Sequence, residues 1–329
     1  MNTRKLGSTD IEISPIVLGC MTFSGGANWG EQDENASINT IRAALDAGIT
    51  TFDTAEGYAN GLTETILGKA LGRDREKVVI LSKVAPKNAA YDNVIAACEA
   101  SLARLGTDYL DLYMIHWPSR EVPFEETMRA MEKLKTDGKV RAVGVSNFGV
   151  LDLDEILKCG VISANQLCYS MLFRGIEYSI LPKCVENNIG VLTYSSLAQG
   201  LLTGKYLTAD EFPVGRARTK HFSSQRREFA RHGEAGHEEI TFLAVNKIKV
   251  IADEMGVPMA SLALAWSMAR PGITSVVAGA RTPAQAIVNA EAARIVIPSD
   301  VMAELTALTD GLKAKFGDIA DPWADGRIR

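Results

Sequence analysis

The chain has 329 residues, 47% of them hydrophobic and 23% charged, which is typical of a folded globular protein and excludes a disordered or collagen-like chain. Lys and Arg number 35 against 40 Asp and Glu, and the net charge of −5 argues against a dedicated nucleic-acid-binding protein. The 5 cysteines include no C-x-x-C spacing, so neither a disulfide framework nor a zinc site is indicated.

The first residues, Met1–Leu6, lack the apolar run of a secretion signal, and no later segment offers the ~18 uninterrupted apolar residues that a membrane span needs. We therefore expect a cytoplasmic protein that binds a small molecule and neither nucleic acid nor a membrane. The first expected element is a β-hairpin at residues 3–14, in which Arg4–Leu6 and Ile11–Ile13 flank the turn-forming Gly7–Asp10.

After the hairpin, short β-rich runs alternate with amphipathic stretches, and this pattern builds a parallel sheet with helical crossovers. The runs are Ile16–Gly19, Thr51–Asp53, Val78–Ser82, Leu110–Ile115, Ala142–Val145, Ala164–Leu167, Gly190–Tyr194 and Ser275–Ala278. Such a series of strands closes a (β/α)8 TIM barrel, and we expect one barrel domain over residues 1–329, with the hairpin capping the barrel bottom. An open doubly wound sheet competes, but no G-x-G-x-x-G follows the first strand.

Two segments lie outside the β/α repeat. Residues 206–239, the flap segment, are rich in charge and poor in apolar periodicity, and we interpret them as a mobile flap over the top face of the barrel. Gly317–Arg329, the tail, is polar apart from Ile319, Trp323 and Ile328, and is expected to fold across the same face.

Polar side chains follow three consecutive strands of the expected barrel. The second strand ends at Asp53, with Tyr58 shortly after it, the third strand is followed by Lys83, and the fourth by His116. Because the carboxyl ends of barrel strands meet on one face, we expect these four side chains to lie together. Singly, they are explained as a helix cap, a loop aromatic, a solvated charge and a structural histidine. Together they favour a catalytic site, since His116 is the only histidine outside the flap segment.

The four side chains suit the delivery of a proton to a carbonyl oxygen. A neighbouring ammonium favours the phenolate, so Lys83 is expected to lower the pKa of Tyr58. Asp53 supplies the counter-charge that Lys83 needs away from water. Tyr58 and His116 can both direct donors at a carbonyl oxygen and stabilise the alkoxide that forms there.

A series of short motifs runs in order along nearly the whole chain. The motifs are Leu18-Gly19-Cys20-Met21, Phe52-Asp53-Thr54-Ala55 with Tyr58, Glu64-x-x-Leu67-Gly68, Ser82-Lys83, Ile115-His116-Trp117-Pro118, Gly144–Phe148, Asn165-Gln166, Tyr194–Lys205 and Gly279–Thr282. This ordered set resembles the aldo-keto reductase family. The resemblance implies an NADP(H)-dependent oxidoreductase of the EC 1.1.1 type acting on an aldehyde, ketone or aldose. It also implies a catalytic tetrad of Asp53, Tyr58, Lys83 and His116, with Tyr58 as general acid and base.

The resemblance further implies an extended nicotinamide cofactor across the barrel mouth, with its carboxamide held by Ser146, Asn147 and Gln166. Tyr194 would stack on the nicotinamide ring. The implied cofactor-binding residues are Cys20, Met21, Asp53, Ser146, Asn147, Gln166, Tyr194, Ser195, Leu197, Gln199, Gly200, Lys205, Arg216, Gly279, Arg281, Gln285 and Asn289. The residue types agree with this placement, because Ser, Asn and Gln match the donors and acceptors of an amide, and Pro283 begins a helix suited to anion contact.

Two arginines indicate the form of the cofactor. Arg281 and Arg216 are similar to the family's clamp on a 2′-phosphate, since guanidinium matches phosphate oxygens, and this favours NADP(H) while NAD(H) stays possible. Val288, where many members carry glutamate, and Ser196, where proline is common, depart from the family pattern. ATP binding is not expected, because Gly200–Lys205 is one residue short of the Walker A spacing.

Aromatic and apolar side chains usually line pockets for small carbonyl compounds. Trp29 lies in a glycine-rich loop after the first strand, and Met21 and Phe23 are nearby in sequence. The flap segment holds six basic residues between Arg216 and Arg231 against Glu228 alone, and a solvated loop is favoured there over a site for an acidic ligand. The expected substrate residues are Trp29, Tyr58, His116 and Trp117.

Two other functions compete. The family includes potassium-channel β-subunits, which keep the barrel and the cofactor but act as partners of a membrane protein with little turnover. In those subunits the histidine position differs, so His116 favours a working reductase. A metal-dependent barrel lyase or isomerase would need converging His and carboxylate ligands, and the expected barrel has a single histidine, so no metal is expected.

Overall fold

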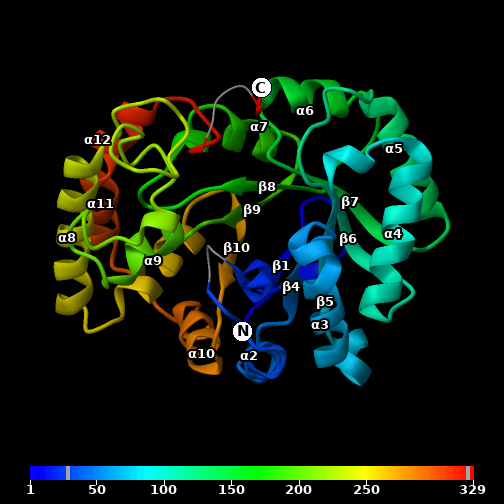
Figure 1. Ribbon diagram of the computed structural model, residues 1–329, viewed down its shortest axis with the longest axis horizontal. Helices are drawn as coiled ribbons and strands as arrows, with labels where there is room; N and C mark the ends of the chain where they lie inside the picture. The colour runs from blue at the N-terminus through cyan, green and yellow to red at the C-terminus, as the bar shows by residue number, and fades with distance from the viewer. Residues whose placement is uncertain (27–29, 324–326) are drawn as a thin grey trace.

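The computed structural model describes residues 1–26, 30–323 and 327–329, and within them eight parallel strands form a closed barrel surrounded by helices (Figure 1). The strands are β3 (Ile16–Gly19), β4 (Thr51–Asp53), β5 (Val79–Val84), β6 (Leu110–Ile115), β7 (Val140–Ser146), β8 (Ala164–Cys168), β9 (Gly190–Tyr194) and β10 (Ile273–Gly279). Around the barrel they run in chain order, and β10 closes the ring between β9 and β3. The predicted fold class is confirmed, and each expected run overlaps one of these strands.

Helices pack on the outside of the barrel (Figure 1). They are α2 (Glu34–Asp46), α3 (Leu62–Leu71), α4 (Tyr91–Leu105), α5 (Phe124–Thr136), α6 (Val150–Ile156), α7 (Ile180–Glu186), α8 (Glu238–Glu254), α9 (Met259–Met268), α10 (Pro283–Ala292), α11 (Ser299–Leu308) and α12 (Asp310–Phe316). In the described parts of the chain, none of the helices has both the length and the apolarity required to cross a bilayer.

The N-terminal hairpin closes the barrel at the ends where the strands begin. Its strands, β1 (Arg4–Lys5) and β2 (Glu12–Ile13), pair antiparallel. At its turn, a Cβ on Gly7 would lie 2.3 Å from the carbonyl oxygen of Ser163, just before β8, so only glycine fits this close approach. Three hairpin side chains pack against the barrel interior, and they are Leu6, Ile11 and Ile13. The hairpin therefore forms part of the core.

The interior of the barrel positions the polar residues of the top face. Alternate residues of a strand point to the same side, so the residue two places after an inward apolar side chain also points inward. At the carboxyl ends of the strands that next residue is polar and lies at the barrel mouth. The pairs are Leu81 and Lys83, Met114 and His116, Ala164 and Gln166, and Leu192 and Tyr194.

The flap segment is more closely packed than its composition suggests. Phe212 and Phe222 are buried and stack with ring centroids 4.9 Å apart. His221 is buried as well, with Nε2 3.0 Å from the carbonyl oxygen of Leu172. Arg227 forms ion pairs with Glu238 and Asp210. These contacts give the segment a structural role in the described chain.

Candidate active site

The Lys83 ammonium lies at the centre of the four predicted catalytic side chains. Lys83 Nζ donates to both oxygens of Asp53, at 2.7 and 2.8 Å, and to the carbonyl oxygen of Thr54 at 2.8 Å. The Lys83 side chain is 0% exposed and that of Asp53 is 3% exposed. A charge removed from water to this extent needs such a set of partners. Thr54, which sequence reasoning missed, contributes through its backbone.

Tyr58 and His116 complete the tetrad on the open side of Lys83. Lys83 Nζ lies 3.4 Å from Tyr58 Oη. The rings of Tyr58 and His116 meet edge to face, with centroids 5.6 Å apart and planes at 78°. Both rings are partly exposed at the barrel mouth, where a small molecule can reach them. The structure thus brings all four predicted catalytic residues together.

The acidity of Tyr58 differs from the sequence-based expectation. Burial raises the pKa of Tyr58 above its ordinary value; Lys83 opposes this shift and Asp53 adds to it. The expected effect of Lys83 is present, but the net shift is upward because burial outweighs it. The phenol therefore keeps its proton at neutral pH, as a proton donor must.

The two neighbouring bases have opposite protonation states. Burial lowers the pKa of Lys83, but the charges of Asp53 and Tyr58 outweigh burial, so the net shift is upward and Lys83 stays an ammonium. Burial, assisted by Lys83, lowers the pKa of His116 to about 3, so His116 is neutral at physiological pH. A neutral imidazole can still donate its one N–H to a substrate oxygen.

The residues predicted to hold the nicotinamide form one hydrogen-bonded group, here called the nicotinamide cluster: Ser146, Asn147, Gln166 and Tyr194. The Tyr194 hydroxyl donates to Asn147 Oδ1 at 2.7 Å, and Asn147 Nδ2 donates to Ser146 Oγ at 3.0 Å and to the His116 carbonyl at 3.1 Å. Ser146 Oγ donates to the Gln166 carbonyl at 3.0 Å. Gln166 Nε2 donates to Asp53 Oδ2 at 2.7 Å. These amide and hydroxyl groups fit a carboxamide ligand chemically.

Most of the described residues other than glycine that have left-handed backbone lie in the loops of this face. Non-glycine residues with positive φ include Ala59 and Asn60, beside Tyr58, and Asn147 in the nicotinamide cluster. Three more lie in the loop after β9: Ser195, Ala198 and Gln199, at φ of 55°, 47° and 56°. In the same loop, Gly200 has φ of 111°. Such conformations are costly for residues other than glycine and gather at functional sites.

The predicted contacts of the adenosine end lie around the start of α10. The Arg281 N–H donates to Gln285 Oε1 at 2.8 Å, and Asn289 Nδ2 donates to the Gly279 carbonyl at 3.1 Å. Arg281 Nε donates to Gln32 at 2.9 Å, whereas Arg216 Nη1 lies 3.4 Å from the Gln199 carbonyl. The two arginines predicted to share a phosphate thus have different neighbours. Three other predicted residues are Lys205 and Met21, both exposed, and Cys20, which is buried.

The tail crosses the same face, as expected, and adds a residue whose role the sequence did not predict. The indole of Trp323 stacks on Tyr194, with ring centroids 6.0 Å apart and planes at 14°. With its side-chain amide in the orientation that satisfies both groups, Gln199 accepts from Trp323 Nε1 at 3.0 Å and donates to the Arg216 carbonyl at 3.0 Å. An aromatic residue in a polar tail was the available signal.

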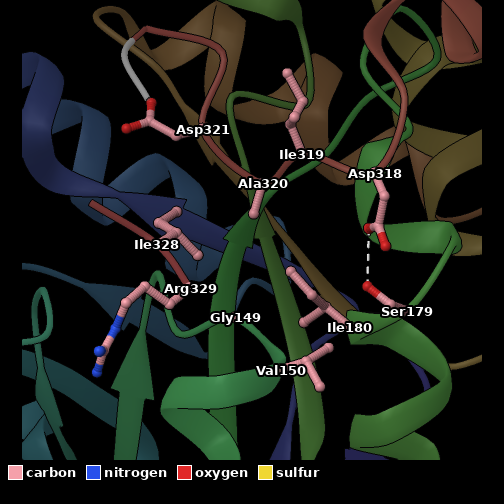
Figure 2. A pocket seen from close by; sticks show the side chains of 10 residues that line it. All are labelled: Gly149, Val150, Ser179, Ile180, Asp318, Ile319, Ala320, Asp321, Ile328 and Arg329. Atoms are coloured by element: carbon pink, nitrogen blue, oxygen red, sulfur yellow. Dashed lines mark hydrogen bonds between the residues drawn. The ribbon is translucent and has the colours of Figure 1, made fainter. Parts of the chain in front are cut away.

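The end of the tail is fixed beside α6 (Figure 1). The Arg329 carbonyl accepts from the N–H groups of Leu151 and Asp152, at 3.0 and 3.2 Å. A Cβ on Gly149 would lie 2.2 Å from that carbonyl, so the tail can approach only a glycine here. A hollow of about 370 Å³ lies between the tail and the starts of α6 and α7, and Figure 2 shows the side chains that line it. None of the predicted site residues that the structure describes lines this hollow.

The predicted substrate residues are placed unequally. The guanidinium of Arg327 lies 4.1 Å above the Trp117 ring, and Arg327 also pairs with Asp321 at 2.6 Å. Phe23 belongs to the hydrophobic core. Trp29 lies outside the described residues. The mouth beside His116 is therefore bounded by Trp117 and by the end of the tail.

Comparison with known proteins agrees with this geometry. Residues 15–310 match the sequence profile of the Aldo/keto reductase family. The chain belongs to this family. This aldo-keto reductase is therefore an oxidoreductase of a family that uses NAD(P) and acts on small carbonyl compounds.

Relatives of this aldo-keto reductase extend along most of its length. The aldo-keto reductase YhdN of Bacillus subtilis (strain 168) is 37% identical over 296 residues, which cover 87% of this chain and 86% of that protein. The NADH-specific methylglyoxal reductase of Escherichia coli (strain K12) is 34% identical over 322 residues, covering 88% and 93%. A solved aldo/keto reductase of Klebsiella pneumoniae, in complex with NADP and acetate, has a TM-score of 0.73 at 32% identity, covering 94% and 96%.

Proposed function

We propose that this aldo-keto reductase transfers a hydride between NADP(H) and a carbonyl or alcohol substrate, an aldehyde, ketone or aldose, with Tyr58 as general acid and base. The observation that carries the proposal is the position of Tyr58 Oη, 3.4 Å from a buried ammonium that Asp53 holds in place. A phenol beside such an ammonium can release a proton and leave a stabilised phenolate.

The residues of the chain have separate tasks in the reduction. The cofactor, when bound, supplies the hydride that adds to the carbonyl carbon. Tyr58 gives its proton to the carbonyl oxygen as charge develops there, so the product is an alcohol. Lys83 stabilises the phenolate that remains, and Asp53 keeps Lys83 charged. His116, neutral at physiological pH, donates its ring N–H to the same oxygen. Oxidation of an alcohol reverses each step.

We infer that the cofactor lies across the nicotinamide cluster and the loop after β9. The side-chain amides of Asn147 and Gln166 and the hydroxyl of Ser146 match the hydrogen-bonding groups of a carboxamide. Gly200, at φ of 111°, has no side chain, and Arg216 Nη1 lies 3.2 Å from the place of a Cβ, so the bare backbone here lies beside a guanidinium that suits a phosphate. Arg281 and Arg216 favour the 2′-phosphate of NADP(H), although one relative is named as NADH-specific.

The competing function is a channel β-subunit that binds the cofactor but turns over little. The tetrad geometry favours the reductase, because His116 lies against Tyr58 at the partly exposed barrel mouth. A protein that only binds the cofactor does not need this pair. Turnover therefore discriminates between the two functions.

The test replaces Tyr58 with Phe, which removes the proton donor and keeps the ring. We expect NADPH binding, read by protein fluorescence, to be nearly intact, while oxidation of NADPH by a panel of aldehydes, ketones and aldoses falls by about 100-fold or more. Tyr178→Phe is the matched control, since Tyr178 is 45% exposed and outside the site. Turnover that is unchanged in Tyr58→Phe with any carbonyl compound would refute the assignment.

A further inference from the structure

Gln166 connects two groups of residues that lie on opposite sides of the barrel. Its Nε2 donates to Asp53 Oδ2 at 2.7 Å, and both side chains are buried. Gln166 lies on β8 and Asp53 on β4, which are separated by three strands in either direction around the closed ring. The hydrogen bond therefore spans the mouth of the barrel and joins the nicotinamide cluster directly to the catalytic tetrad.

The orientation of the Gln166 amide follows from its partner. An ionised carboxylate only accepts hydrogen bonds, so the NH2 group of Gln166 must face Asp53. The Oε1 atom then points away from Asp53, and no donor to it is recorded in the described chain. An amide can donate through nitrogen and accept through oxygen at once. Gln166 can therefore hold a carboxamide N–H and Asp53 at the same time.

The bond matters because Asp53 acts on Tyr58. The Asp53 carboxylate takes donors from Lys83 on one side and from Gln166 on the other. Its charge opposes ionisation of Tyr58, whereas Lys83 favours it. A hydrogen bond to a charged acceptor is stronger than a neutral one and offsets part of that negative charge. Among the residues that the structure describes, four charged or titratable groups face Asp53 and Tyr58. They are Lys83 from β5, Cys20 after β3, His116 after β6 and Tyr194 from β9.

We propose that Gln166 is a positioning residue for proton transfer: through Asp53 it makes Tyr58 easier to ionise, in addition to its proposed contact with the cofactor. The inference deepens the proposed function and rests on it. It assigns the Gln166 side chain both to binding of the hydride-donating cofactor and to proton transfer from Tyr58. Binding of the nicotinamide carboxamide at Gln166 Oε1 polarises the amide and strengthens its donation to Asp53, since linked hydrogen bonds reinforce one another.

The variant Gln166→Met tests this role of Gln166. It keeps the length of the side chain and removes the hydrogen bond to Asp53 together with the proposed hydrogen bond to the cofactor carboxamide. Ser146→Ala is the matched control, because Ser146 belongs to the same cluster and its hydroxyl contacts only the Gln166 backbone and Asn147 among the described residues. Tyr58 ionisation is read by fluorine NMR in protein labelled with 3-fluorotyrosine, whose phenol is more acidic than that of tyrosine. The chain has 8 tyrosines, and the Tyr58 signal is the one missing from Tyr58→Phe.

We expect the Tyr58 pKa in Gln166→Met to lie above that of the wild type by about half a unit or more, and in Ser146→Ala to match the wild type. Gln166→Leu, which also lacks an amide donor, should raise the Tyr58 pKa in the same way and provides a second reading if the Met variant does not fold. The single-turnover rate of reduction, measured at saturating NADPH, should fall at high pH as Tyr58 loses its proton. In the Gln166 variants this fall should occur at a higher pH than in the wild type.

An unmoved Tyr58 titration in both Gln166 variants, with weakened NADPH binding, would show that Gln166 serves the cofactor alone and would overturn the inference. The titration needs no turnover, so it separates this inference from the proposed function. If no carbonyl compound is reduced, the proposed function fails while the coupling of Gln166 to Tyr58 is still measured. If reduction is normal and the titration does not move, only the inference fails.

Discussion

Removal of the Lys83 ammonium is the perturbation with the largest consequence in this structure. In Lys83→Met, Asp53 loses its ammonium partner in a site where its side chain is 3% exposed, and Gln166 is the side-chain donor left to it among the described residues. Loss of one partner from a buried ion pair costs about 3–5 kcal/mol of unfolding free energy. Because Gln166 still donates to Asp53, we expect a loss near the lower limit, about 3 kcal/mol, together with the loss of turnover.

Urea unfolding, followed by circular dichroism and fluorescence, measures this loss. Lys133→Met is the control, since the Lys133–Asp137 pair lies on the surface and should contribute less than about 0.5 kcal/mol. Adding Asp53→Asn to Lys83→Met removes the unpaired charge and should restore at least about 1 kcal/mol without restoring activity. The reasoning is refuted if Lys83→Met costs no more than Lys133→Met, or if the double variant is less stable than the single one.

Three further predictions follow from particular contacts. Arg281→Ala should weaken NADPH binding by about tenfold more than NADH binding, measured by fluorescence titration, because only NADPH offers a 2′-phosphate; equal losses would argue against the clamp. The folded pKa of His116, about 3, lies below its ordinary value, so the unfolded chain takes up a proton that the folded chain excludes. His116 should therefore make stability rise with pH from about 3 to about 6.5, and His116→Gln should flatten the stability curve in that window; an unchanged slope would contradict the assignment. Gly149→Ala should displace residues 327–329, lower the unfolding free energy by about 1–3 kcal/mol and expose the tail to trypsin, whereas Gly57→Ala, with no described atom within 4 Å of its Cβ, should not; equal protection in both variants would refute the packing argument.

The sequence carried enough local information to predict the barrel and the tetrad. The strands are recognisable as short apolar runs. Because alternate residues of a strand point to the same side, the run also predicts which residue after it points into the barrel. Asp53, Lys83 and His116 could be placed on one face for this reason, before any contact was known. The turn-forming residues that begin at Gly7 likewise predicted the hairpin, whose packing under the barrel is visible only in the structure.

Contacts between distant parts of the chain could not be read in this way. Gln166 and Asp53 are 113 residues apart, and only closure of the barrel brings them together. The stacking of Trp323 on Tyr194 depends on the path of the tail, which has no periodicity to reveal it. The effect of Lys83 on the pKa of Tyr58 could be predicted, but the upward net shift could not, because burial, its largest cause, is a property of packing.

The path of the hydride tests the proposed reaction most directly. We would mix the protein with NADPH deuterated at the transferred position of the nicotinamide and an aldehyde, and analyse the alcohol by mass spectrometry and NMR. The proposed reaction predicts one deuterium on the former carbonyl carbon, formed rapidly by the wild type and only slowly by Tyr58→Phe. An alcohol without deuterium, or formation at the same rate in both proteins, would contradict it.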